Sequence, residues 1–304
     1  MTSIASCKQV HGRVVILLAF VFSSIVLIGT ATAQEPLRVL SFNLRYGLAN
    51  DGDNSWDNRK DHVVTTIENY QPDVVGTQET LEFQAAHIGD KLTEFTYAGR
   101  SRQKDGKGEH CGIFFRTSRF DKLIEGHFWL SENPDQPGSK SWDSSLPRMA
   151  TWLKLWDRTN QHAFYLINTH FDHRGANARA ESAKLIRRFV ESLPSGSNVI
   201  ITGDFNAGVN SGPYTALFAE DATASPATPS PVVDTFAAMN PDAKDNVGTF
   251  NAFKGTDSGA RIDWIAASRK IEILNASIDR TAFDGKFPSD HFPVTAELRL
   301  PKLE

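Results

Sequence analysis

Short, nearly continuous apolar segments recur along this chain, and they limit its possible folds more than any other feature. They lie at residues 37–43, 73–78, 112–116, 123–130, 151–156, 163–169, 198–202, 261–267, 271–278 and 294–300. Strands that are apolar throughout are usually covered on both faces, and apolar residues at helical spacing mark segments 63–70, 80–92 and 183–193. The pattern predicts an α/β (α+β) fold: a four-layer sandwich of two packed, mostly antiparallel β-sheets flanked by helices.

The first 33 residues have the pattern of a secretory signal peptide. Lys8 and Arg13 precede an apolar run at 14–28, and the small residues Ala31, Thr32 and Ala33 follow it. We expect cleavage after Ala33, a domain at 34–304, and an exported protein, periplasmic or secreted, with no stable membrane insertion after cleavage. The alternative is an uncleaved anchor, but the run is shorter than the roughly 20 residues that span a bilayer.

Charge and cysteine content exclude some functional classes. Without the signal the chain keeps 30 basic and 36 acidic residues, and it has no basic tail, which argues against tight binding of nucleic acid by bulk charge. Cys7 and Cys111 are the only cysteines of the sequence, so neither a disulfide scaffold nor a CxxC zinc module is possible.

Polar side chains interrupt or end several of the apolar segments, where a rigid scaffold can present functional groups. Each has an ordinary structural explanation, as a turn former, a first-turn acid or a buried histidine. Their repeated position at strand ends favours a common site. The residues are Asn43, Glu79, His170, Asp204, Asn206 and Asp263, together with Asp290 and His291 before the last segment.

Asp263 is the hardest of these to explain structurally. Its neighbours Ile262, Trp264 and Ile265 place it in a buried strand, where an unpaired carboxylate costs several kcal/mol. A histidine is the simplest partner, so we expect Asp263 to orient His291 and to stabilise its cation.

Asn43, Glu79 and Asp290 provide only oxygen ligands. Sets with few carboxylates suit Mg²⁺ or Mn²⁺, which keep several waters and complete their coordination on a substrate phosphate. The composition of this set points to cleavage of a phosphate ester.

Six motifs resemble the endonuclease/exonuclease/phosphatase superfamily, the deoxyribonuclease-I-like metal-dependent phosphoesterases. They are SFNLR, TQET, NTHFDH, GDFNA, RIDWI and SDHFP, spread in order over residues 37–300. The spacing of WDNRKD, GEHCGIFF and PRMATW is most similar to a bacterial branch, with some likeness to nocturnin and deadenylase-type nucleotidases.

The resemblance implies a role for each residue of the set. Glu79 binds the metal, with Asn43 and Asp290 nearby. Asp204 activates the attacking water and Asn206 holds both Asp204 and the phosphate. His291, oriented by Asp263, neutralises phosphoryl charge, and His170 contacts the phosphate or protonates the leaving oxygen.

Further residues are weaker candidates for substrate binding: Arg148, His110, Asp172 and His173, followed by Glu109 and Arg174. Arg148 could bind a phosphate bidentately, or form a surface ion pair instead. Arg45 stands where apurinic endonucleases of the superfamily have an Asp. This departure favours a single metal or an additional phosphate contact.

The expected partner is a phosphate ester: a nucleotide, a nucleic acid, a phospholipid head group or a sugar phosphate. Its choice depends on the loops at 44–57, 100–110, 131–146 and 219–231. Two alternatives stay open. NTHFDH nearly matches the HxHxDH zinc motif of metallo-β-lactamase-like hydrolases, although His291 is the only later histidine. The chain could also be a binding module that kept the scaffold without its chemistry.

Overall fold

The computed structural model describes residues 1–2, 6, 9, 34–220 and 228–301. The chain divides into two units, Met1–Ala33 and Gln34–Glu304, and the account below concerns the second. The predicted signal peptide lies outside the described residues except for residues 1–2, 6 and 9. Within the described residues, no helix is both long enough and apolar enough to cross a bilayer.

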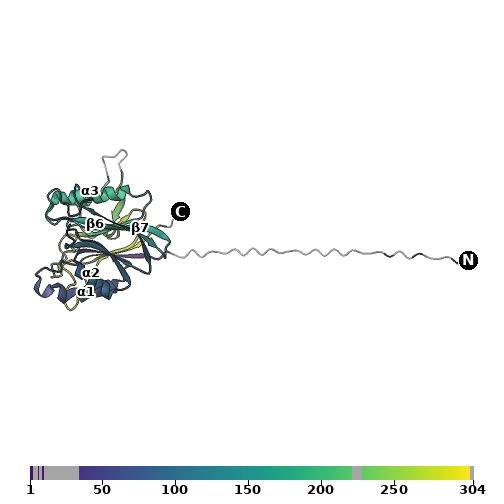
Figure 1. Ribbon diagram of the computed structural model, residues 1–304, viewed down its shortest axis with the longest axis horizontal. Helices are drawn as coiled ribbons and strands as arrows, with labels where there is room; N and C mark the ends of the chain where they lie inside the picture. The colour runs from purple at the N-terminus through teal and green to yellow at the C-terminus, as the bar shows by residue number, and fades with distance from the viewer. Residues whose placement is uncertain (3–5, 7–8, 10–33, 221–227, 302–304) are drawn as a thin grey trace. The chain divides into compact units, whose positions relative to one another are not determined.

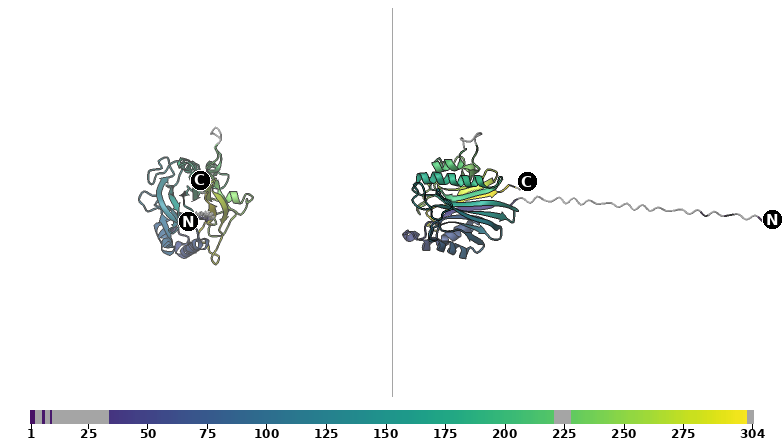
Figure 2. Two further views of the ribbon diagram at one scale, coloured as in Figure 1. Left: turned by 90° about the vertical axis from the view of Figure 1, so that its right-hand side faces the viewer. Right: turned by 45° about the horizontal axis from the view of Figure 1, so that its top comes forward.

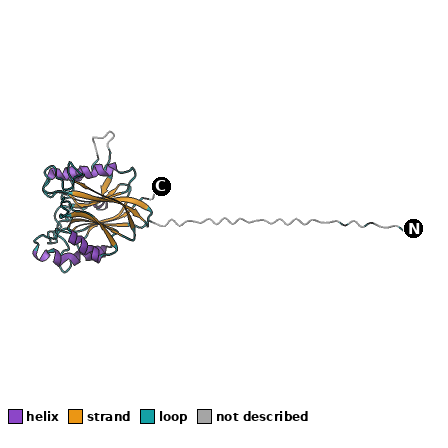
Figure 3. Ribbon diagram, viewed as in Figure 1, coloured by secondary structure: helices purple, strands orange, loops and turns teal. Residues whose placement is uncertain are grey.

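Two six-stranded sheets form the centre of the domain (Figures 1 and 3). The first has the order β11-β12-β1-β2-β4-β3 and the second β5-β6-β7-β8-β10-β9. Only the pairs β1–β2 and β7–β8 are parallel among the described strands, so both sheets are mostly antiparallel, as predicted. The strands are β1 Leu37–Asn43, β2 Val74–Thr80, β3 Phe95–Ala98, β4 His110–Arg116, β5 Phe120–Trp129, β6 Met149–Asp157, β7 His162–His170, β8 Val199–Asp204, β9 Val232–Asp234, β10 Asp263–Ser268, β11 Glu272–Ile278 and β12 Val294–Arg299.

Helices cover the outer face of each sheet, which completes the predicted four layers (Figures 1 and 2). Helices α1 and α2 pack on the first sheet, and α3 and α4 pack on the second. The remaining helices are short. Their bounds are α1 Trp56–Tyr70, α2 Glu82–Lys91, α3 Ala176–Ser192, α4 Gly212–Phe218, α5 Thr235–Met239 and the 3₁₀ turn Gly52–Asn54.

Burial on both faces explains why the strands are apolar throughout. In β1, Val39 points into the core between the sheets, whereas its neighbour Leu40 packs with α1 and α2. In β8, Ile200 faces the other sheet and Ile201 faces α3. Successive side chains of a strand point to opposite faces, so each central strand contributes to two apolar layers.

Two strands escape prediction because they are short. β3 and β9 are short edge strands, and three of the four residues of β3 are only half buried. An edge strand that is partly exposed lacks the apolar run that reveals a central strand.

The topology brings distant polar residues to the same end of the sandwich. The parallel strands β1 and β2 carry Asn43 and Glu79 at or near their carboxyl ends. In the other sheet, His170 pairs with Asp204, which in turn pairs with Asp263 at the start of the antiparallel β10. The rigid sheets therefore set the spacing of the site.

Candidate active site

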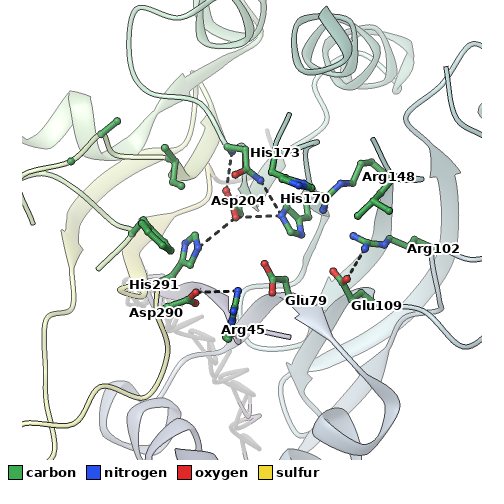
Figure 4. A pocket seen from close by; sticks show the side chains of 16 residues that line it. Arg45, Glu79, Arg102, Glu109, Arg148, His170, His173, Asp204, Asp290 and His291 are labelled. Atoms are coloured by element: carbon green, nitrogen blue, oxygen red, sulfur yellow. Dashed lines mark hydrogen bonds and ion pairs between the residues drawn. The ribbon is translucent and has the colours of Figure 1, made fainter. Parts of the chain in front are cut away.

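A cavity of about 530 Å³ opens at this end of the sandwich. Figure 4 shows acids, imidazoles and guanidinium groups from both sheets converging on it. The structure thereby brings most of the predicted set together. The lining includes Glu79, His170, Asp204, Asn206, Asp290 and His291, with Arg45, Arg102, Glu109, Arg148 and His173.

Asp204 lies where the predicted residues meet. Its Oδ2 accepts a hydrogen bond from Asn43 Nδ2 (3.0 Å), and its Oδ1 accepts one from the backbone N–H of Asn206 (2.8 Å). Burial and the nearby carboxylate of Asp263 raise the pKa of Asp204 to about 7. A carboxylate with such a pKa can accept a proton from water near neutral pH.

Asp263 and His291 form the expected pair behind the cavity. His291 Nδ1 lies 2.9 Å from Asp263 Oδ2, and both side chains are buried. Burial alone would lower the pKa of His291, but the carboxylates of Asp263 and Asp204 outweigh it and raise the pKa well above its usual value. The imidazole is therefore cationic, and its Nε2, 3.9 Å from Asp204 Oδ2, carries a proton at the cavity.

His170 has the opposite character. Burial and the cations of Arg148 and Arg102 lower its pKa well below the usual value. Asn206 Nδ2 donates to the carbonyl of Phe171 and lies 3.1 Å from His170 Nε2, and Asp204 Oδ2 lies 3.4 Å from the same ring nitrogen. A neutral His170 held between Asn206 and Asp204 is suited to positioning, and His291 is the cationic imidazole of the site.

Glu79 and Asn43 lie side by side, and the backbone conformation of Glu79 is unusual. Glu79 is in the left-handed region (φ 57°), next to an irregularity in the β2–β4 pairing that turns its side chain into the cavity. Its oxygens accept from Tyr46 N (2.7 Å) and Asn43 Nδ2 (3.2 Å). Asn43 Oδ1 accepts from Arg45 N (2.9 Å), so Asn43 presents its NH₂ group to the acids. It orients Glu79 and Asp204, and this differs from the ligand role that the resemblance implies.

The remaining acids fit a hard divalent cation. Glu79 and Asp204 lie close enough to hold one ion together with His170, and Asp290 lines the same cavity. The carboxylates offer oxygen atoms, the donor type that Mg²⁺ and Mn²⁺ prefer. Burial raises the pKa of Asp290, and the charge of Glu79 adds to this effect. Arg45 offsets part of the negative charge of these acids, because its Nη1 lies 3.5 Å from Asp290 Oδ2 while its Nη2 lies 2.8 Å from Asp51 Oδ1. A bound cation would offset more of it.

Arg148 supplies positive charge on the opposite wall. Its side chain is buried, its Nη2 lies 3.0 Å from His173 Nδ1, and its Nε and Nη1 have no hydrogen-bond partner among the described residues. Asp172 lies 3.6 Å from Nε, but its Oδ2 is occupied by Ser145 and Leu146 and its Oδ1 by Arg174 and Gly175. Asp172 thus positions Arg148 and the 145–146 loop and does not line the cavity.

One predicted residue lies outside this cavity. Of the residues that line the cavity, one was not predicted and one was only a weaker candidate. The ring of His110 lies with Tyr97 (Nδ1–OH 2.9 Å) in a separate cavity, so the structure does not place it near the phosphate site. Sequence patterns missed Arg102, which lies in a loop and reaches the site only because Arg102 N bonds to Glu109 O (2.9 Å). Glu109, a weaker candidate, accompanies it in the lining.

The zinc alternative finds no geometric support. Among the described residues, the groups that could hold a metal are Glu79, His170 and Asp204, and Asp204, Asp263 and His291. The first group contains His170 of the near match to the zinc motif, but neither group contains the Asp172 or His173 of that motif.

Comparison with known proteins agrees with the geometry. A solved endonuclease/exonuclease/phosphatase family protein from Bacteroides thetaiotaomicron is 32% identical with a TM-score of 0.78, covering 88% of this chain and 99% of that one. A mannosyl-6-phosphatase from the same organism is also 32% identical, with a TM-score of 0.76 and coverage of 86% and 99%. Nocturnin from Drosophila melanogaster is 26% identical over 199 residues, 57% of this chain and 29% of that protein. The chain spans 29% to 59% of the length of the curated relatives that it matches.

The family itself follows from a match over most of the chain. The sequence profile of the endonuclease/exonuclease/phosphatase family covers residues 40–291, from β1 to the imidazole that pairs with Asp263. The chain therefore belongs to the endonuclease/exonuclease/phosphatase family, whose members are phosphoesterase hydrolases.

Proposed function

We propose that this protein is an exported, divalent-metal-dependent phosphomonoesterase. One observation carries the proposal: the buried guanidinium of Arg148 lines the same cavity as Asp204 and His291, and its Nη1 and Nε have no hydrogen-bond partner among the residues that the structure describes, Nε lying 3.6 Å from Asp172 Oδ2. A planar guanidinium matches the oxygens of a phosphate group, and a carboxylate beside a cationic imidazole is suited to hydrolysis.

Glu79 and Asp290 would hold the cation, with Asn43 fixing the orientation of Glu79 through the Nδ2–Oε1 contact of 3.2 Å. A bound Mg²⁺ or Mn²⁺ supplies positive charge that offsets the charge developing on the phosphoryl oxygens.

The other residues take different parts in the reaction. Asp204 accepts a proton from the attacking water, while Asn43 and the backbone N–H of Asn206 keep its oxygens in place. His291, held by Asp263 at Nδ1, carries a proton at Nε2 and neutralises charge that develops on a phosphoryl oxygen. His170, neutral and fixed by Asn206, lines the wall between Asp204 and Arg148 (Figure 4).

With a divalent cation bound, the charge of the cavity would favour a monoester. A phosphomonoester carries about −1.5 to −2 charge at pH 7, more than the single charge of a diester. The positive groups of the lining, Arg45, Arg102, Arg148 and His291, face four carboxylates, Glu79, Glu109, Asp204 and Asp290, so the cation would supply the net positive charge. The similarity to a mannosyl-6-phosphatase supports this choice and makes sugar phosphates the first substrates to test.

Nucleotides or nucleic acid are the second candidate, favoured by the similarity to Nocturnin. The excess of acidic over basic residues argues against tight binding of double-stranded nucleic acid by this protein, because such binding depends on many Lys and Arg contacts to phosphates.

A substrate panel tests the proposal. The purified protein is assayed with Mg²⁺ or Mn²⁺ on hexose phosphates, nucleotides, phospholipid head groups and oligonucleotides, with and without a chelator. We expect metal-dependent release of phosphate from monoesters and weaker or no cleavage of diesters. Absence of metal-dependent hydrolysis of every ester would refute the proposal, and a preference for oligonucleotides would replace it with the nuclease alternative.

Export rests on the residues at the start of the chain, where Lys8 and Arg13 precede the apolar run and Ala33 ends it. Mass spectrometry of the protein recovered from its producing cells should find an amino terminus at Gln34. An intact Met1 in the membrane fraction would indicate an uncleaved anchor.

A further inference from the structure

The cavity continues past the catalytic residues to a second polar wall. Arg102 and Glu109 lie there beyond Arg148, on the far side of the cavity from His291 (Figure 4). Nothing in the hydrolysis described above uses this pair. If the phosphate of a bound phosphomonoester lies between Arg148 and Asp204, the leaving group extends toward Arg102 and Glu109.

The pair is built into a braced loop. Arg102 N donates to Glu109 O (2.9 Å), and Ser101 bridges to His110 across the base of the loop. Ser101 Oγ also accepts from Gly108 N (2.7 Å), and Trp129 Nε1 donates to Arg102 O (2.7 Å). These contacts fix the backbone of the loop that carries both side chains, which lowers the entropy cost of ordering the loop when a ligand binds.

Arg102 is buried, Glu109 is half-buried, and the guanidinium of Arg102 is incompletely bonded. Arg102 Nη2 donates to Glu109 Oε1 (2.5 Å), while Arg102 Nε has no hydrogen-bond partner among the described residues. The side chains are 8% and 14% exposed. Burying such a pair is costly unless its remaining donors and acceptors are satisfied. The incomplete bonding therefore points to a ligand.

The chemistry of that ligand follows from the pair. A carboxylate only accepts hydrogen bonds and a guanidinium only donates them. A hydroxyl group does both, so neighbouring hydroxyls can bond to the two side chains together. An aromatic or alkyl leaving group offers no donor or acceptor to the atoms of the pair that do not bond to each other.

We infer that Arg102 and Glu109 bind the hydroxyl groups of the leaving alcohol and select sugar or other polyol phosphates over aryl phosphates. The inference rests on the proposed phosphomonoesterase activity. It assigns substrate choice to one face of the 100–110 loop, apart from the residues that act on the phosphate.

The variant Glu109→Gln tests the inference because it keeps the shape of the side chain but turns one acceptor into a donor. The assay compares kcat/KM for glucose 6-phosphate and mannose 6-phosphate with kcat/KM for p-nitrophenyl phosphate. We expect the sugar-to-aryl ratio to fall about 10- to 100-fold. Competitive inhibition by the matching free hexose, with p-nitrophenyl phosphate as substrate, should weaken in parallel.

Glu68→Gln is the matched control, since Glu68 is exposed on α1 and does not line the cavity. It should keep the wild-type ratio. Arg102→Lys keeps the charge but loses the planar guanidinium, so it should shift the ratio in the same direction as Glu109→Gln. It provides an independent test if Glu109→Gln proves less stable than the wild type.

The outcomes separate the two proposals. If the wild type hydrolyses both kinds of ester and the variants lower both equally, the assignment of Arg102 and Glu109 is overturned while the phosphomonoesterase proposal stands. Hydrolysis of the aryl ester without any sugar phosphate would also overturn the assignment. If the wild type hydrolyses neither with Mg²⁺ or Mn²⁺, the proposed function itself fails.

Discussion

At the scale of single residues, the site depends on a carboxylate and an imidazole whose environments shift their pKa values in useful directions. Asp204 is buried next to Asp263, which raises its pKa to about 7, and His291 lies between both carboxylates, which keeps it cationic. Base and acid therefore coexist at neutral pH, as hydrolysis requires.

The pH dependence of activity should reflect Asp204. The carboxylate accepts a proton only when ionised, so kcat/KM should fall as the pH drops through about 7, the value to which burial and Asp263 raise its pKa. A pH profile of kcat/KM at saturating metal measures this limb. A profile that stays flat down to pH 5 would show that Asp204 is not the base, and Asp204→Asn should abolish activity across the range.

Replacing Asp263 should separate positioning from direct catalysis. In Asp263→Asn, His291 loses the carboxylate 2.9 Å from Nδ1, so its pKa should fall and its proton should be lost at a lower pH. We expect kcat to drop at least about 10²-fold with little change in KM, and the alkaline limb of the profile to move to lower pH. An unchanged alkaline limb would contradict the proposed role of the pair.

Strand ends carried most of the site information that could be predicted from sequence. Asp204, Asp263 and His291 could be predicted because burying a charged or imidazole group among apolar residues is costly unless the group has a partner or a function. The direction in which the Asn43 amide points could not be predicted, because it depends on Arg45 N and two carboxylates from other segments. Arg102 was missed for a similar reason, since cross-loop hydrogen bonds place it in the cavity.

At the scale of elements, the two sheets approach each other closely at Gly76, just behind the site. Gln78 Nε2 donates to Asn168 Oδ1 (2.7 Å), and Thr202 Oγ1 donates to the same oxygen (3.1 Å), joining β2, β7 and β8. Central strands were predictable from their apolar runs, but this buried polar bridge was not. It leaves no room for a side chain at position 76 of β2.

Gly76→Ala should therefore destabilise the domain. A Cβ at this position would lie 2.1 Å from Thr202 Oγ1 and 2.8 Å from Asn168 Oδ1, so the sheets would have to move apart. We expect a loss of about 1–3 kcal/mol in the free energy of unfolding, measured by urea denaturation. The control is Gly89→Ala in α2, where a Cβ meets no atom within 4 Å and stability should rise by about 0.4–1 kcal/mol. Equal stability of the two variants would contradict the close approach of the sheets.

At the scale of the whole molecule, two rigid sheets hold a cluster of acids that would repel one another without a cation. Glu79 lies on the first sheet, Asp204 on the second, and Asp290 in the segment before β12. A cation bound between them would link parts of the chain that are far apart in sequence. Metal binding should therefore stabilise the folded domain and not only support its activity.

A thermal melt with and without metal tests this link. A ligand that binds only the native state stabilises it by about 2.7 kcal/mol at a concentration 100 times its Kd. We expect Mg²⁺ or Mn²⁺ to raise the Tm, a chelator to reverse the rise, and Ca²⁺ to act less strongly because it prefers more ligands and longer distances. Asp290→Asn should reduce the shift, whereas Asp61→Asn on the exposed face of α1 should keep it. If Asp290→Asn responds to metal like the wild type, Asp290 does not bind the cation. The roles assigned to Glu79, Asp290 and Asp204 would then be wrong.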